Sequence, residues 1–192
     1  FKHWSQFHPY SDILIESAKP FALSLFSPSS YILNMVKEIE GKYNIDYDNT
    51  CVLFLRGGDK ATETKIPTYA DYLTEVQKNH QAENLRYLIQ SDESEFLVQM
   101  TDTFKQSFYF KDEIRTISRS RKGQVDKCYE ANNFEFTMQF LAITIIMSKC
   151  KYVYCNTGNC SLLILLYRTL SNGFYQLIYR NGKPIWYTPS MK

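Results

Sequence analysis

Histidine, glycine and proline are scarce in this chain, and no cysteine spacing suggests a metal site. The 192 residues include three His, seven Gly, six Pro and five Cys. The cysteines form no C-x-x-C pair, so no zinc site is expected. Five is an odd number, so at least one cysteine is unpaired. Cys51, Cys150 and Cys155 lie in apolar runs, and we expect them to be small core residues in a reducing compartment.

Charge of one sign and long apolar runs are also lacking. The 22 Lys and Arg against 20 Asp and Glu give a net charge of +2, which is too balanced for the basic face that duplex nucleic acid requires. No apolar run approaches the roughly 20 residues of a membrane span. No signal peptide is readable, so a cytoplasmic location is expected, although a first residue that is not Met is compatible with a longer product. The sequence gives no sign of oligomeric state.

Aromatic residues are abundant, at 16% of the chain, with 15 Tyr, 13 Phe and 2 Trp. The length allows one full domain, or one domain with a remnant of a second. A chain of this length buries roughly 70% of the surface that its unfolded form exposes. The sequence therefore predicts a globular domain whose core needs neither disulfides nor metal.

Apolar periodicity predicts strands and helices that alternate along the chain. Residues 1–28 lack a clean period, and we expect irregular coil there with a short strand at 21–26. Strands are expected at 51–55, 85–90, 107–110, 152–155 and 173–179, and helices beginning near 30, 67, 94, 133 and 160. This order predicts an α/β, Rossmann-like layered domain with a mainly parallel sheet flanked by helices. We divide the chain into a segment with a helix (1–45), the α/β domain (46–180) and a tail (181–192).

Ligands bind past the carboxyl ends of the strands in such sheets. Three expected strand ends carry polar or glycine-containing clusters, at 56–60, 91–93 and 156–159. Because parallel strands end at the same edge, we expect these clusters to form one site.

The sharpest of the clusters is the turn from Arg56 through Gly57, Gly58 and Asp59 to Lys60. Glycines let backbone amides approach an anion, and an arginine can bind phosphate oxygens bidentately. Lys60 adds a point charge, and Asp59 is placed to orient Arg56 or to cap the turn. The alternative is a glycine turn with solvated charges. The spacing matches neither a Walker A loop nor a dinucleotide fingerprint.

The second cluster, Asn156, Thr157, Gly158 and Asn159, follows a buried strand and opens a helix. Helix N-termini present free amides and a partial positive charge, which suits a diphosphate. The alternative is simple capping of the helix by Thr157 or Asn159.

Carboxylates and a basic loop complete the candidate set. Glu63 is a candidate general base for a sugar hydroxyl, or a surface charge. Asp92 and Glu93 are candidates for ribose or base contacts, or for capping the next helix. The basic loop 119–122 is a candidate to close over a phosphate, or is solvated.

Three of these segments together resemble a known family. The segment FLRGGDK at 54–60 resembles the H-V-R-R-[GT]-D-[KY] motif of GT-B fucosyltransferases, in both the core-fucosylating and the blood-group-H-like branches. The segment YLIQSDE at 87–93 resembles the family's strand ending in S/T-D-D. The segment MSKCKYVYCNT at 147–157 is similar to its L-M-S-x-C-K-H-x-I-x-x-N-S stretch. The resemblance covers about residues 51–170.

The resemblance implies the nucleotide-sugar-binding half of a GT-B glycosyltransferase. Such an enzyme transfers fucose from GDP-fucose to a glycan or glycoconjugate hydroxyl with inversion and without a metal or other cofactor. By this resemblance, Arg56 and Lys60 bind the diphosphate and Asp92 contacts the nucleoside. Glu63, which matches the family only after a one-residue gap, acts in catalysis beside Arg56. The turn at 156–159 completes the phosphate pocket. Without a metal, arginine and helix-terminus amides offset the charge of the leaving diphosphate.

The chain also departs from the family pattern. Phe54 replaces the family's histidine, Gly57 replaces its second arginine, and no acid lies near 143–144. That histidine and acid help to hold guanine in the core-fucosylating branch. Two alternatives follow, a glycosyltransferase with a different nucleotide sugar and a non-catalytic or degenerate Rossmann-like binding domain. Convergence of Arg56, Lys60 and Glu63 on one cleft distinguishes an enzyme from a binding domain.

Overall fold

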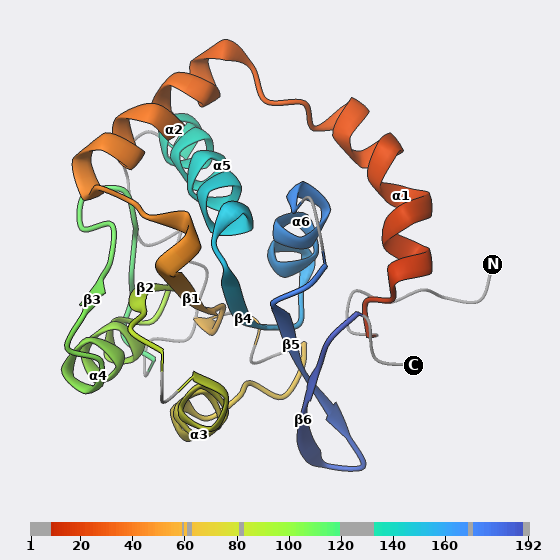
Figure 1. Ribbon diagram of the computed structural model, residues 1–192, viewed down its shortest axis with the longest axis vertical. Helices are drawn as coiled ribbons and strands as arrows, with labels where there is room; N and C mark the ends of the chain where they lie inside the picture. Colours follow the sequence, from red (N-terminus) through yellow and green to blue (C-terminus); the bar gives the residue numbers. More distant parts are fainter. Residues whose placement is uncertain are drawn as a thin grey trace.

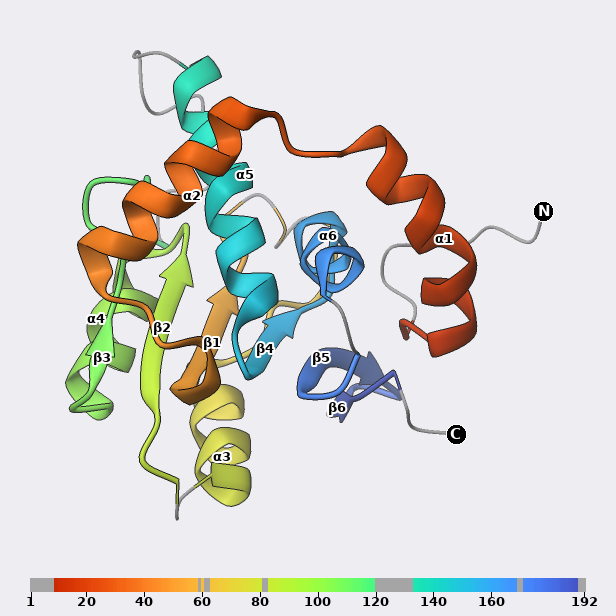
Figure 2. The same cartoon turned by 45° about the horizontal axis from the view of Figure 1, so that its top comes forward.

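The computed structural model describes residues 9–58, 60, 63–80, 83–119, 133–168 and 171–189. Within them a mostly parallel sheet of six strands is flanked by helices, as Figures 1 and 2 show, so the α/β, Rossmann-like fold class is confirmed. Asp59 and the basic residues 121 and 122 lie outside the described residues.

The strand order in the sheet is β3-β2-β1-β4-β5-β6. Neighbours from β3 to β5 pair in parallel, and β6 is antiparallel to β5. The bounds are β1 (Thr50–Leu55), β2 (Arg86–Ser91), β3 (Ser107–Phe108), β4 (Tyr152–Asn156), β5 (Phe174–Arg180) and β6 (Lys183–Tyr187). The chain leaves β1 toward β2 on one side and reaches β4 on the other, so the connections change direction beside β1.

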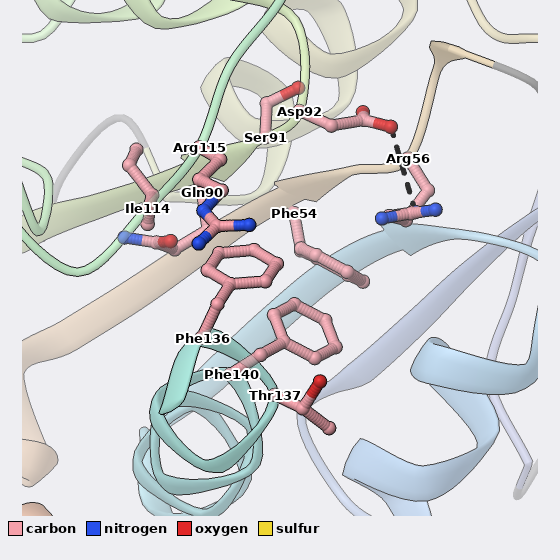
Figure 3. Close-up of a pocket in the computed structure, with 10 residues that line it drawn as sticks. All are labelled: Phe54, Arg56, Gln90, Ser91, Asp92, Ile114, Arg115, Phe136, Thr137 and Phe140. Atoms are coloured by element: carbon pink, nitrogen blue, oxygen red, sulfur yellow. Dashed lines mark ion pairs between the residues drawn. The ribbon is translucent and has the colours of Figure 1, made fainter. Parts of the chain in front are cut away.

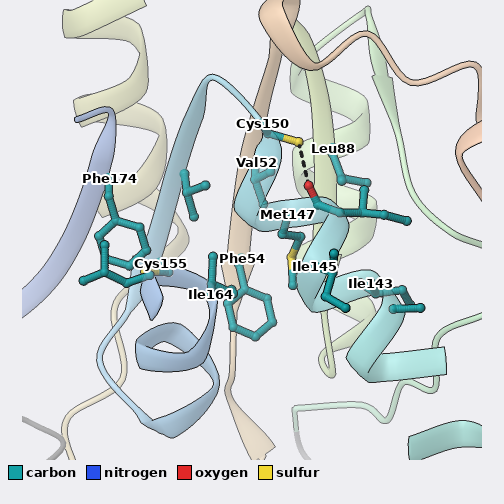
Figure 4. Close-up of a cluster of buried hydrophobic side chains, with 14 of the residues drawn as sticks. Val52, Phe54, Leu88, Ile143, Ile145, Met147, Cys150, Cys155, Ile164 and Phe174 are labelled. Carbon is teal, nitrogen blue, oxygen red and sulfur yellow. Dashed lines mark hydrogen bonds between the residues drawn. The ribbon is translucent and has the colours of Figure 1, made fainter. Parts of the chain in front are cut away.

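Helices cover both faces of the sheet. One hydrophobic cluster unites α2, α5 and α6 with the sheet, and Figure 4 shows part of it; a second cluster unites α3 and α4 with the opposite face. The bounds are α1 (Asp12–Leu25), α2 (Ser30–Tyr43), α3 (Tyr69–His80), α4 (Ser94–Thr103), α5 (Asn133–Lys149) and α6 (Asn159–Tyr167), with a short 3-10 turn η1 (Tyr47–Asn49). All six residues of β1 are buried, because side chains on both of its faces are covered.

Two expectations at the ends of the chain are wrong. The strand expected at 21–26 is instead the second half of α1, which carries Pro20 inside it and packs beside α6. The irregular apolar pattern arises because Phe21 and Leu25 of this helix are exposed while Ile15 is buried. The expected tail at 181–192 contains β6, which joins the sheet by pairing with β5.

The expectation that three cysteines are small core residues is confirmed. Cys51, Cys150 and Cys155 are free and buried. Burial raises the pKa of the Cys155 thiol to about 12, so it behaves as a small apolar side chain rather than as a nucleophile. Among the described helices, none is long and apolar enough to cross a membrane.

A buried arginine joins the segments behind the sheet. The guanidinium of Arg168, at the end of α6, donates to the carbonyl oxygens of Ser148 at 3.1 Å and Cys150 at 2.7 Å. It also donates to those of Lys151 at 3.2 Å and Asn172 at 2.7 Å. These carbonyls lie in the α5–β4 turn and in the approach to β5, so one side chain satisfies backbone acceptors that secondary structure leaves unpaired.

Replacement of this arginine should destabilise the whole domain. We expect Arg168→Leu to lower the free energy of unfolding by about 3 kcal/mol or more, because it leaves several buried carbonyls without donors. Urea unfolding followed by circular dichroism measures the change. The control is Arg180→Leu, at an exposed position of β5, which should change stability by less than about 0.5 kcal/mol. Equal effects of the two variants would contradict the assigned role.

Candidate functional site

The strand ends that the sequence singles out do meet. Arg56 follows β1, Asp92 follows β2, and Asn156 is the last residue of β4. Since β1 lies between β2 and β4, side chains at these positions flank the backbone of Arg56 and Gly57 from both sides.

Asn156 holds the backbone of Arg56 through both of its amide atoms. Its Oδ1 accepts from the backbone N–H of Arg56 at 2.9 Å, and its Nδ2 donates to the carbonyl of Arg56 at 2.8 Å. Asn156 is almost completely buried. The sequence assigns Asn156 to a phosphate pocket, but in the structure its side chain fixes the start of the loop that carries Arg56.

Asp92 holds the same loop from the other side. Its Oδ1 accepts from the backbone N–H of Gly57 at 2.7 Å, and its Oδ2 lies 3.6 Å from Nε of Arg56. The Asp92 side chain is 4% exposed and that of Arg56 is 27% exposed. A buried carboxylate therefore orients a partly exposed guanidinium, the role that the sequence offered to Asp59.

Gly57 is required by its neighbour Glu93. A Cβ at position 57 would lie 1.9 Å from Oε1 of Glu93, so no side chain fits there. Glu93 is buried, accepts from the Tyr69 hydroxyl at 2.8 Å, and has Nε of Arg119 at 3.8 Å from its Oε1. Desolvation raises the pKa of Glu93. Its contacts are internal to the protein, and no base or ribose contact is needed to explain them.

Lys60 and Glu63 form an ion pair. Nζ of Lys60 lies 2.8 Å from each carboxylate oxygen of Glu63, and the Glu63 side chain is 38% exposed. Neither residue lines the cavity beside Arg56 described below, so convergence of Arg56, Lys60 and Glu63 on that cavity is not observed.

The turn before α6 is shaped by Tyr10. The Gly158 N–H donates to the Tyr10 hydroxyl at 3.1 Å, and this hydroxyl donates to the Gly158 carbonyl at 2.9 Å. Gly158 has φ of 153° and is the N-cap of α6, without a side-chain cap. Thr157 accepts from Nε2 of Gln176 at 2.9 Å. The N-cap position of α6 is therefore occupied by Gly158 rather than by Thr157 or Asn159, and the Gly158 amide is already bound.

A small cavity of about 110 Å³ opens beside Arg56. In Figure 3, Arg56 and Asp92 lie at one end, Gln90 and Ile114 at the other, and phenyl rings between them. Its lining residues are Phe54, Arg56, Gln90, Ser91, Asp92, Ile114, Arg115, Phe136, Thr137 and Phe140. They come from β1, β2, the segment after β3, and the first turns of α5. Of the predicted site residues, Arg56 and Asp92 line this cavity.

Sequence reasoning missed the aromatic wall and Gln90. Gln90 is 3% exposed, and its Nε2 has no hydrogen-bond partner among the described residues. A polar residue in an otherwise apolar strand was the available signal. No group of three or more His, Cys, Asp or Glu in the described part of the chain is arranged to hold a metal ion.

The fit of Gly57 against Glu93 can be tested by adding one methyl group. We expect Gly57→Ala to lower the free energy of unfolding by about 1–3 kcal/mol, because the added carbon overlaps the Glu93 carboxylate. Thermal unfolding measures the change. In Gly41→Ala, on an open face of α2, the same addition should stabilise by about 0.5–1 kcal/mol. Glu93→Ala should reduce the cost of Gly57→Ala; additive effects of the two substitutions would contradict the contact.

Comparison with known proteins finds solved structures of similar fold. No protein-family model matches the chain, and no curated protein matches its sequence. A crystal structure of NodZ alpha-1,6-fucosyltransferase co-crystallised with GDP gives a TM-score of 0.50 at 11% identity, and covers 83% of this chain and 48% of the enzyme chain. The same enzyme soaked with GDP-fucose gives 0.51 at 10% identity, with 83% and 49% covered.

The chain thus spans about half the length of the enzymes that it matches. At 10–11% identity the likeness concerns the fold, and it agrees with the strand order and the parallel sheet. The chain has the fold of one Rossmann-like half of a GT-B fucosyltransferase.

Proposed function

We propose that this chain is the donor-binding half of a glycosyltransferase and binds a nucleoside diphosphate sugar at the carboxyl edge of its sheet. The observation that carries the proposal is the fixed and partly exposed guanidinium of Arg56. Asn156 holds its backbone, Asp92 accepts from the next N–H along the chain, that of Gly57, and a cavity with an aromatic wall lies beside it. A pre-oriented arginine next to a ring-sized cavity suits a ligand with an anionic part and a flat part.

Arg56 is assigned to the diphosphate. Its guanidinium is oriented by Asp92 from one side, and the planar fork of an arginine matches the geometry of phosphate oxygens. Lys60 is assigned to the same group as a second positive charge, with the backbone amides of Thr157 and Asn159; the Gly158 amide is already bound by Tyr10. In a metal-independent transfer these groups offset the charge that grows on the leaving diphosphate. Gly57 and Gly58 keep the loop backbone close to the ligand.

Glu63 is assigned the role of general base. In an inverting transfer one acceptor hydroxyl attacks the anomeric carbon while the diphosphate leaves, and the base takes the hydroxyl proton. Both oxygens of Glu63 are bound by Lys60. Donor phosphate drawing Lys60 away would release the carboxylate for this proton transfer, so donor binding and base activation are coupled.

The donor has two candidate identities. GDP-fucose is the first, because the sequence resembles fucosyltransferases and the similar structures hold GDP or were soaked with GDP-fucose. A different nucleotide sugar is the second, favoured by Phe54 at the position of the family's guanine-binding histidine. The proposed acceptor is a glycan or glycoconjugate hydroxyl.

The alternative function is a binding domain without catalysis. It is favoured by the pairing of Glu63 with Lys60 away from the cavity.

Calorimetric titration with GDP, GDP-fucose and UDP tests donor binding. We expect Arg56→Ala to weaken the binding of the preferred nucleotide by about 10- to 100-fold, because charge-assisted bonds to the diphosphate are lost. Arg56→Lys should lie between Ala and the unaltered chain, since it keeps the charge without the fork. Arg180→Ala, on exposed β5, is the control. The proposal would be contradicted if none of the nucleotides bound, or if binding were unchanged in Arg56→Ala.

Glu63→Gln separates binding from catalysis. We expect it to leave nucleotide affinity within about twofold and to lower the release of free sugar from the preferred donor by at least about 100-fold, as loss of a general base does. The matched control is Glu38→Gln, on the exposed face of α2. Donor turnover that persists in Glu63→Gln would show that another group takes the proton. Turnover by neither the variant nor the unaltered chain would favour the binding domain.

A further inference from the structure

The cavity beside Arg56 contains an unsatisfied buried donor. Gln90 lines this cavity and is 3% exposed, and its buried Nε2 has no hydrogen-bond partner among the described residues. Burying an amide donor without an acceptor is costly. Such a donor, in an otherwise aromatic cavity, indicates a ligand that brings an acceptor.

The aromatic residues make the cavity suitable for a flat ring. Phe136 and Phe140 project from α5 and Phe54 from β1, as Figure 3 shows. Aromatic side chains stack on bases of any identity. These rings therefore supply affinity, and the polar groups at the edge of the cavity decide which base is accepted.

The volume favours a single ring. The cavity measures about 110 Å³, and a cavity of roughly 150 Å³ accepts one benzene ring. The two fused rings of a purine would require the phenylalanines to move apart, whereas a pyrimidine needs little rearrangement.

Donor groups outnumber acceptor groups among the side chains of this cavity, which also include the hydroxyls of Ser91 and Thr137. Gln90 offers one amide donor and one carbonyl acceptor, and the Arg115 guanidinium offers donors only. Oδ1 of Asp92 accepts from the Gly57 N–H, and its buried Oδ2 pairs with Nε of Arg56 at 3.6 Å, which is longer than a hydrogen bond. Guanine presents adjacent N–H donors at N1 and N2 beside its acceptors O6 and N7, so its N–H edge calls for two acceptors side by side. Uracil presents two carbonyl acceptors around one N–H donor.

We infer that Gln90 is a specificity-determining residue and that the cavity takes uracil, so that the donor is a uridine diphosphate sugar rather than GDP-fucose. Nε2 of Gln90 donates to a uracil carbonyl, and its Oε1 accepts from N3–H. The diphosphate then extends toward Arg56 at the opposite end of the cavity. This inference rests on the proposed function of the site and names its substrate class.

The test compares UDP and GDP by calorimetry on the whole chain and on Gln90→Glu. We expect UDP to bind the unaltered chain at least about tenfold more tightly than GDP. This factor corresponds to leaving one buried group of the GDP complex without a hydrogen bond. Gln90→Glu exchanges the donor for a second acceptor, so it should weaken UDP and strengthen GDP, which reverses the preference. Gln99→Glu makes the same change on the exposed face of α4 and should leave the ratio unchanged.

The outcomes separate this inference from the proposed function. GDP binding as tight as UDP binding, and dependent on Arg56, overturns the inference and leaves the nucleotide site standing. Binding of neither nucleotide overturns both. If Gln90→Glu does not fold, Gln90→Met serves instead, and it should reduce the UDP preference to about twofold or less. If Gln90→Met keeps the preference for UDP over GDP, other residues determine the base specificity, and the role of Gln90 is overturned.

Discussion

The paired hydrogen bonds between the Asn156 side chain and the Arg56 backbone are the constraint on which the site depends. Together with the hydrogen bond from the Gly57 N–H to Asp92, these bonds hold the backbone of Arg56 as firmly as that of a strand residue, although Arg56 lies in a loop. This arrangement exists because β1 lies between β2 and β4, which brings side chains from distant parts of the chain to one peptide. A guanidinium mounted in this way loses little freedom on binding an anion, so more of the interaction energy appears as affinity.

Gly57 shows how one substitution can depend on another. The carboxylate of Glu93 fills the space that a side chain at position 57 would need, and Tyr69 and Arg119 hold that carboxylate in place. Where the fucosyltransferase motif has a second arginine, this chain has an internal cluster instead. The absence of a side chain at position 57 is thus linked to the Glu93 cluster behind the loop, and Arg56 and Arg115 are the arginines that line the cavity.

The regular elements were predictable because their signals are local. Continuous apolarity located β1 and β4, and α5 matched its expected bounds, since a buried segment must be apolar along its whole length. The first helix was missed because Pro20 and exposed apolar residues disturb its period. The site was predictable only to the level of strand ends. The contacts that Asn156, Asp92 and Tyr10 make join residues far apart in sequence, and no spacing along the chain reveals them.

Tyr10 gives the N-terminal segment a role at the opposite end of the sequence. Its hydroxyl occupies both the amide and the carbonyl of Gly158, and its ring is fully buried. The turn that opens α6 is therefore completed by a side chain that must arrive from 148 residues away. During synthesis, Tyr10 can complete this corner of the domain only after the 148 residues up to Gly158 have emerged.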